Sequence, residues 1–217
     1  MHYRVSLPLL LLLSLLWLPA GALAAQCSVL ILGDSLSSGL GLAPGQGWVD
    51  RLDARLKQST PQWRAVNASV SGDTTQNGLQ RLVPALARQQ PQGVLIELGA
   101  NDILRGTPPN LIKQNLLALV RQAKANDTWV VLLEAPVLPN YGKAYTDAVT
   151  KLYGEVAHAE KITLIPCFVC GVALQPGMMQ ADGMHPNEKA QDSMLAAVWP
   201  YLKPKLHCPR NAYPERP

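Results

Sequence analysis

Five short segments rich in Val, Ile and Leu are spaced along the chain. Within each of them the apolar residues run on continuously instead of alternating with polar ones, which is typical of strands that are covered on both faces of a sheet. We therefore expect five buried strands. They span residues 28–33, 63–67, 93–99, 128–134 and 161–166.

Stretches with helical periodicity lie between and after these segments. In one of them Leu79, Leu82 and Leu86 recur at the spacing of a single helix face. The prolines at 108–109 and at 186 are expected to open two further helices, because the first helical position needs no N–H donor. Strands that alternate with helices form βαβ units with right-handed crossovers. The chain is therefore predicted to be an α/β protein, a three-layer α/β/α sandwich with a central, mostly five-stranded parallel sheet.

Residues 1–24 have the features of an export signal. Arg4 provides a positive start, residues 9–18 form an apolar core, and Ala22 and Ala24 fit the small-x-small cleavage rule. The apolar core is shorter than the roughly 20 residues that a membrane-spanning helix needs. We therefore favour a cleaved signal peptide over an uncleaved anchor, and expect a periplasmic or secreted protein with no stable membrane insertion.

The rest of the chain is expected to form one domain and a tail. Residues 25–202 carry the strand and helix patterns, whereas residues 203–217 contain four prolines and no periodic pattern, as in a loose tail. Of the 217 residues, 48% are apolar and only 16% are charged, which excludes intrinsic disorder of the bulk. The net charge is +4 and no two Lys or Arg residues are adjacent, so we expect no nucleic-acid partner.

Export also bears on the state of the four cysteines. Cysteines of exported proteins meet oxidising conditions, so we expect at least one disulfide among Cys27, Cys167, Cys170 and Cys208. The C-x-x-C at 167–170 could belong to a redox or zinc site, but no second pair lies at zinc-finger spacing, and structural pairing is favoured. The connectivity stays open. Cys167 and Cys170 are the closest in sequence, and Cys27 could reach Cys208 only if the tail folds back over the first strand.

Polar residues follow several of the predicted strands. In an open parallel sheet, ligands bind outside the carboxyl ends of the strands. Ser35 comes directly after the first strand, where its hydroxyl can project into such a crevice. A helix N-cap is the more ordinary role for a serine at this place, so Ser35 alone does not predict chemistry.

His185 changes the interpretation of Ser35. It is the one histidine that lies in a loop directly before a predicted helix, and Asp182 precedes it by three residues with a glycine between. A tight turn can place that carboxylate against the imidazole, which is how a third group orients the base of a Ser-His pair. The other histidines lie in the signal, in a helical pattern and in the tail, at His2, His158 and His207.

Acyl transfer also needs donors aimed at the oxyanion that develops in the transition state. Gly72 follows the second strand, and its bare backbone allows an N–H to approach closely. Asn101 follows the third strand and carries an amide donor. Together with the backbone N–H of Ser35, these groups form a candidate oxyanion hole at neighbouring strand ends.

These residues lie in four motifs that resemble the blocks of the SGNH, or GDSL, hydrolases: GDSL at 33–36, NASVSGDT at 67–74, GAND at 99–102 and DGMH at 182–185. The resemblance implies a flavodoxin-like fold for the sandwich. It implies Ser35 as the nucleophile, Asp182 and His185 as the rest of the triad, and the Ser35 and Gly72 N–H groups with Asn101 as oxyanion donors. It requires neither a metal nor another cofactor.

The expected function is hydrolysis of carboxylic ester or thioester bonds in lipid-like substrates. The partner is then a small-molecule or lipid ester, and we expect a monomer. Apolar residues at the crevice rim, Ile103, Leu104, Val137 and Leu138, are expected to contact the acyl chain and to favour medium or long chains over acetyl. Two alternatives stay open, a carbohydrate acetylesterase of the same fold and a non-catalytic module that binds lipids or glycans.

Overall fold

The computed structural model describes residues 26–137 and 141–208, and its centre is a five-stranded sheet. The spatial order of the strands is β2-β1-β3-β4-β5, and every neighbouring pair is parallel. The strand count and direction that the sequence predicts are therefore confirmed. The strands are β1 (Cys27–Gly33), β2 (Trp63–Asn67), β3 (Gly93–Glu97), β4 (Trp129–Leu133) and β5 (Thr163–Ile165).

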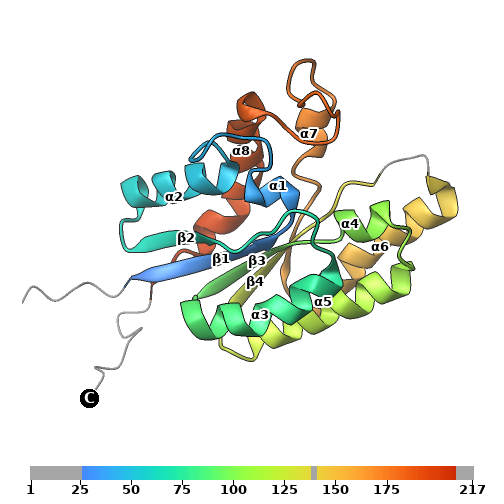
Figure 1. The fold of residues 1–217 in the computed structure, drawn as a ribbon. Helices are drawn as coiled ribbons and strands as arrows, with labels where there is room; N and C mark the ends of the chain where they lie inside the picture. Colours follow the sequence, from blue (N-terminus) through green and yellow to red (C-terminus); the bar gives the residue numbers. More distant parts are fainter. Residues whose placement is uncertain (1–25, 138–140, 209–217) are drawn as a thin grey trace, which may run out of the picture.

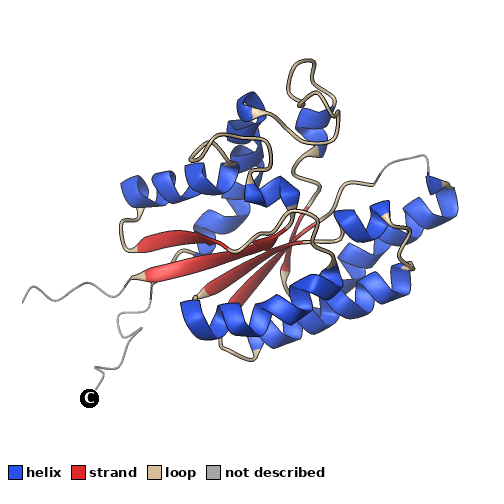
Figure 2. Cartoon of the chain, in the orientation of Figure 1, coloured by secondary structure: helices blue, strands red, loops and turns tan. Residues whose placement is uncertain are grey.

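Helices cover both faces of this sheet and complete the predicted three layers (Figures 1 and 2). One face carries α2 (Trp48–Ser59) and α8 (Gln191–Leu202), and the other carries α3 (Thr75–Gln89), α5 (Pro109–Lys124) and α6 (Lys143–Glu160). Shorter elements follow the strand ends or lie near the chain's end. They are α1 (Ser35–Ser38), α4 (Ala100–Leu104), α7 (Cys170–Ala173) and the 3₁₀ turns η2 (Glu188–Ala190) and η3 (Lys203–Lys205).

The central strand β1 contributes to both apolar layers because successive side chains of a strand point to opposite faces. Val29 and Ile31 pack in the layer that includes α2 and α8, whereas Leu30 and Leu32 pack in the layer that includes α3 and α5. All four side chains are completely buried. This two-sided burial is why the strand reads as a continuous apolar run in the sequence.

The last helix begins later than the sequence predicts. Pro186 was expected in its first turn, but α8 starts at Gln191. The Asn187 side chain accepts a hydrogen bond from the Lys189 N–H and caps the intervening turn η2. The residues between Pro186 and α8 therefore form a separate 3₁₀ turn.

The expectation of a loose tail from residue 203 is wrong for its first six residues. Residues 203–205 form the 3₁₀ turn η3, and Leu206 is only 7% exposed in the apolar layer of α2 and α8. Cys208 then forms a disulfide with Cys27 at the start of β1. One apolar residue and one cysteine carry this contact, and neither leaves a periodic signal. Residues 209–217 and the predicted signal at 1–24 lie outside the described residues.

Two disulfides are present, which confirms that at least one forms. The second joins Cys167 to Cys170, so the C-x-x-C is closed on itself. The two bridges involve all four cysteines, so the described residues contain no free thiol. In residues 26–137 and 141–208, no helix has the length and apolar character that crossing a membrane requires.

The long-range disulfide is expected to contribute more stability than the short one. Its cysteines are 181 residues apart, against 3 for the second bridge, and a cross-link restricts the unfolded chain more when it closes a longer loop. Replacing Cys27 and Cys208 together by Ser should lower the free energy of unfolding by about 2–4 kcal/mol. Replacing Cys167 and Cys170 together by Ser is the matched control and should cost less, as measured by urea unfolding without reductant. An equal or larger loss in the control would contradict this ranking.

Candidate active site

Ser35, His185 and Asp182 come together beside the carboxyl ends of the strands. His185 Nε2 lies 2.9 Å from Ser35 Oγ, and His185 Nδ1 lies 2.6 Å from Asp182 Oδ2. Ser35 is the first residue of α1 and is separated from the end of β1 by Asp34 alone. The other two residues lie in the loop that leads to α8, with His185 150 positions further along the chain. The fold therefore joins the three residues that the sequence singled out into one hydrogen-bonded row.

The Asp182 carboxylate is held by its own loop. Its Oδ1 accepts hydrogen bonds from the backbone N–H groups of Met184 at 2.9 Å and His185 at 3.0 Å. The His185 N–H, the His185 ring and then the Met184 N–H lower the pKa of Asp182 to about 2. An ionised Asp182 accepts the Nδ1–H of His185, which leaves Nε2 free to accept a proton from Ser35.

Gln180 fixes this loop against the segment that carries Ser35. Its backbone N–H donates to the His185 carbonyl at 2.8 Å, and its side-chain Nε2 donates to the Leu40 carbonyl at 2.8 Å and to the Pro186 carbonyl at 3.1 Å. Leu40 lies just after α1. Gln180 thus ties the loop of the base to the loop of the nucleophile, a role that no sequence pattern indicated.

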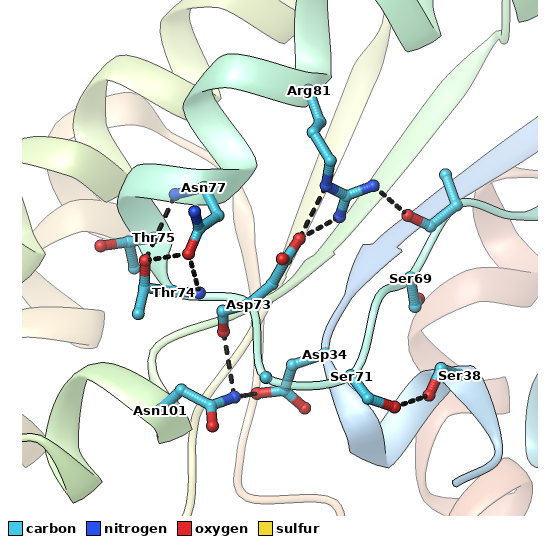
Figure 3. A network of polar contacts seen from close by, with 12 residues as sticks. Asp34, Ser38, Ser69, Ser71, Asp73, Thr74, Thr75, Asn77, Arg81 and Asn101 are labelled. Carbon is cyan, nitrogen blue, oxygen red and sulfur yellow. Dashed lines mark hydrogen bonds and ion pairs between the residues drawn. The ribbon is translucent and has the colours of Figure 1, made fainter.

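The backbone N–H groups of Ser35 and Gly72 are candidate donors of an oxyanion hole. Within residues 26–137 and 141–208, no protein acceptor is found for the N–H of Ser35 or of Gly72. Gly72 has φ of +84°, a left-handed conformation that favours glycine. Arg105 donates to the Gly72 carbonyl at 3.0 Å. Figure 3 shows Arg81 reaching the same loop, where it binds the Asp73 carboxylate and the Ala68 carbonyl.

Asn101, the third predicted donor, is the second residue of α4. The next residue, Asp102, is buried and anchors α4 to α3 by accepting hydrogen bonds from the Thr75 N–H at 2.8 Å and the Thr75 hydroxyl at 2.7 Å. Asn101 Nδ2 donates to Asp34 Oδ2 at 3.1 Å and to the Asp73 carbonyl at 3.0 Å (Figure 3). Both amide hydrogens therefore have a protein acceptor, so a substrate oxygen would have to share or replace one of them.

A cavity of about 180 Å³ opens beside these groups and is mainly apolar. Of the predicted substrate-contact residues, Ile103 and Leu104 line it. Val137 does not, because it packs against the apolar layer of α3, α5 and α6 while its neighbour Pro136 faces the cavity. Leu138 lies outside the described residues. The sequence analysis missed four lining residues from the last third of the chain: Val169, Ala173, Met179 and Met184.

The C-x-x-C motif is closed by a disulfide and forms part of the cavity wall. Its cysteines are bonded to each other, and Val169, which lies between them, lines the cavity. In the portion of the chain that the structure describes, no three His, Cys, Asp or Glu residues are grouped so that they could hold a metal ion.

Comparisons with known proteins show the family to which the chain belongs. Residues 31–192 match the model of the GDSL-like Lipase/Acylhydrolase family. Esterase TesA of Pseudomonas aeruginosa is 48% identical over 183 residues, covering 84% of this chain and 91% of that protein. Thioesterase 1/protease 1/lysophospholipase L1 of Escherichia coli K12 is 39% identical over 205 residues, covering 94% and 95%.

A solved structure shares the architecture. The psychrotrophic esterase EstA from Pseudoalteromonas sp., in a structure inhibited by monoethylphosphonate, superposes with a TM-score of 0.79 at 36% identity and covers 82% of this chain and 98% of that one. The family match covers all four motifs that carry the candidate residues and extends to residue 192. The chain therefore belongs to the GDSL-like Lipase/Acylhydrolase family and is an ester hydrolase of the α/β class.

Proposed function

We propose that the protein hydrolyses carboxylic esters and thioesters of lipid-like substrates by nucleophilic catalysis from Ser35. The observation that carries this proposal is the row of hydrogen bonds from Ser35 through His185 to Asp182 at the mouth of an apolar cavity. The names of the relatives, which include esterase, thioesterase and lysophospholipase, support the same class of bond.

The reaction follows from the positions of the groups. His185 Nε2 accepts the proton of Ser35 Oγ, and the oxygen attacks the carbonyl carbon of the bound ester. The negative oxygen of the tetrahedral intermediate accepts hydrogen bonds from the N–H groups of Ser35 and Gly72 and from the amide of Asn101. The leaving alcohol or thiol takes its proton from His185. Water then enters, loses a proton to His185 and releases the acid and Ser35.

The apolar cavity supports an acyl chain of medium or long length as the preferred substrate group. Ile103 and Leu104 from α4 line it together with Ala173, Met179 and Met184. Burial of each methylene contributes up to about 0.8 kcal/mol, so a few methylenes decide between substrates. A carbohydrate acetylesterase would gain nothing from this apolar wall.

We further propose that the protein acts outside the cytoplasm as a monomer. The signal-like residues 1–24 support export. The two disulfides also support it, since such bonds persist in oxidising compartments.

The first test removes the proposed nucleophile and one oxyanion donor. Ser35→Ala should abolish hydrolysis, because Ser35 Oγ is the group that is proposed to form the acyl-enzyme and that His185 Nε2 contacts. Asn101→Ala should lower kcat by about 10²–10³, because it removes one of the proposed oxyanion donors. Both are measured as kcat and KM on p-nitrophenyl octanoate, with circular dichroism to show that the fold is kept. A folded Ser35→Ala protein that turns over at the wild-type rate would end the proposal.

A second test addresses the acyl chain. The wild type should hydrolyse octanoyl esters with a kcat/KM about tenfold or more above acetyl esters. Ala173→Phe should fill the cavity and lower kcat/KM for octanoyl about tenfold while leaving acetyl nearly unchanged. Leu174→Phe is the matched control, because Leu174 is 89% exposed and lies outside the cavity lining. Equal turnover of acetyl and octanoyl esters would favour the acetylesterase alternative.

A third test uses metal removal. The proposed reaction draws its nucleophile, base and oxyanion donors from side chains and backbone, so dialysis against EDTA should leave kcat/KM unchanged. The control is the same protein dialysed without chelator. Loss of activity that zinc or calcium restores would require a different mechanism.

A further inference from the structure

Two buried acids lie behind the proposed nucleophile and have no part in the triad. Asp34 is fully buried and Glu97 is 2% exposed. They meet because Gly33 of β1 is paired in register with Glu97 of β3. A Cβ atom on Gly33 would lie 2.8 Å from Glu97 Oε2, which is closer than such contacts allow. The glycine of the GDSL motif thus makes room for the Glu97 carboxyl directly before Ser35.

The contacts of the two acids lead to the oxyanion hole. Glu97 Oε2 accepts hydrogen bonds from the Ser37 hydroxyl at 2.7 Å and the Asp34 N–H at 3.3 Å. Asp34 Oδ1 accepts from the Leu36 N–H at 3.0 Å, and its Oδ2 accepts from the amide of Asn101 at 3.1 Å. The carboxyl groups of Asp34 and Glu97 also lie close enough for a hydrogen bond between them to lower the pKa of Asp34 and raise that of Glu97. Such a bond requires that one of the two carries a proton, because two carboxylates are acceptors only.

The charged side chains around the pair do not offset the repulsion that two ionised carboxylates would have without that proton. In the described part of the chain, neither acid forms an ion pair with Lys or Arg. The titratable groups that face them are His185, from the loop before α8, and Tyr153, from α6. Tyr153 is buried, and its hydroxyl donates to the Leu98 carbonyl at 3.0 Å.

The directions of the two pKa shifts favour the proton on Glu97 over Asp34 at neutral pH. Burial, with the neighbouring Asp34 charge adding to it, raises the pKa of Glu97 well above its usual range. Burial also raises the pKa of Asp34, to about 6, where the Leu36 N–H, His185, Asn101 and Glu97 limit the shift. Asp34 is then ionised at neutral pH while Glu97 is a neutral acid.

We propose that Glu97 is a positioning residue for the oxyanion hole: as a protonated acid it donates to Asp34, and the carboxylate held in this way orients the amide of Asn101 beside Ser35. This inference rests on the proposed hydrolase function. Asp34 immediately precedes Ser35, so its negative charge lies near the place where the oxyanion forms. A neutral Glu97 stabilises the Asp34 carboxylate by donating a hydrogen bond to it. An ionised Glu97 would instead add a second negative charge that repels Asp34 and the oxyanion.

The protonation state can be tested without any activity. Infrared difference spectra resolve the C=O stretch of a protonated carboxylic acid from the bands of carboxylates. At pH 7.5, both the wild-type protein and the Ser35→Ala protein should show one band of a protonated carboxylic acid. The substitution Glu97→Gln should remove this band. Glu155→Gln is the matched control and should leave the band in place, because Glu155 is bound by Lys113 and Lys151 and its pKa is lowered. A spectrum without the protonated band, or a band that survives Glu97→Gln, would overturn the proposal even if the protein is an active hydrolase.

The link to Asn101 is tested by two substitutions of similar size. The amide of Glu97→Gln donates and accepts as the protonated acid does, so kcat and its pH profile should stay within about threefold of wild type. Glu97→Met offers no donor, so kcat should fall by about 10–100-fold with KM nearly unchanged, less than the loss on deleting the Asn101 donor. The hydrogen bond from Glu97 favours ionised Asp34, so its loss raises the Asp34 pKa and should move the acid limb of kcat to higher pH.

These outcomes separate positioning from a structural role and from the hydrolase proposal. A purely structural Glu97 would lower thermal stability in Glu97→Met without moving the pH profile or separating kcat from KM. That result would refute the positioning role. A Glu97→Gln protein that folds but has a strongly reduced kcat would refute it as well. Failure of Ser35→Ala to abolish turnover would instead refute the function on which the inference rests.

Discussion

The parallel pairing of β1 with β3 is the constraint on which the site depends. This register places Gly33 beside Glu97, so the chain leaves both strands at the same edge of the sheet. The segment after β1 carries Asp34 and Ser35, and the segment after β3 leads to Asn101. Because the two strands are held by a ladder of hydrogen bonds and by burial on both faces, the distance between nucleophile and amide donor is set by the core of the protein.

Polar contacts then fix the loops that this edge brings together. Arg81 of α3 holds the loop of Gly72, and Asn101 donates to both Asp34 and the loop carbonyl of Asp73 (Figure 3). Asp102 of α4 accepts a hydrogen bond from the Thr75 N–H at the start of α3. Donors ordered in this way during folding need little reorganisation when charge develops in the reaction, which is the main source of their effect on rate. The cost is that both hydrogens of the Asn101 side-chain amide already have protein acceptors, so a substrate oxygen must compete with them.

The sequence predicted those features whose cause is local or periodic. Buried strands leave continuous apolar runs, and the tight turn between Asp182 and His185 is contained within four residues, so both could be found without a structure. The packing of Leu206 in the apolar layer of α2 and α8 could not, because a single apolar residue has no period. The bond between Cys27 and Cys208 was one of several pairings that the sequence left open. Val137 was assigned to the cavity in place of Pro136, since the direction of a loop side chain depends on packing that the sequence does not show. The meeting of Asp34 with Glu97 depends on strand register in the same way.

The central claim is that Ser35 is a nucleophile activated by His185, and covalent labelling tests it most directly. The protein is incubated with a fluorophosphonate, and the adduct is located by mass spectrometry of the intact chain and of its peptides. The account predicts one adduct per chain, on Ser35, with labelling greatly slowed in His185→Ala and absent in Ser35→Ala. An adduct on another residue, or equal labelling of the Ser35→Ala protein, would contradict it.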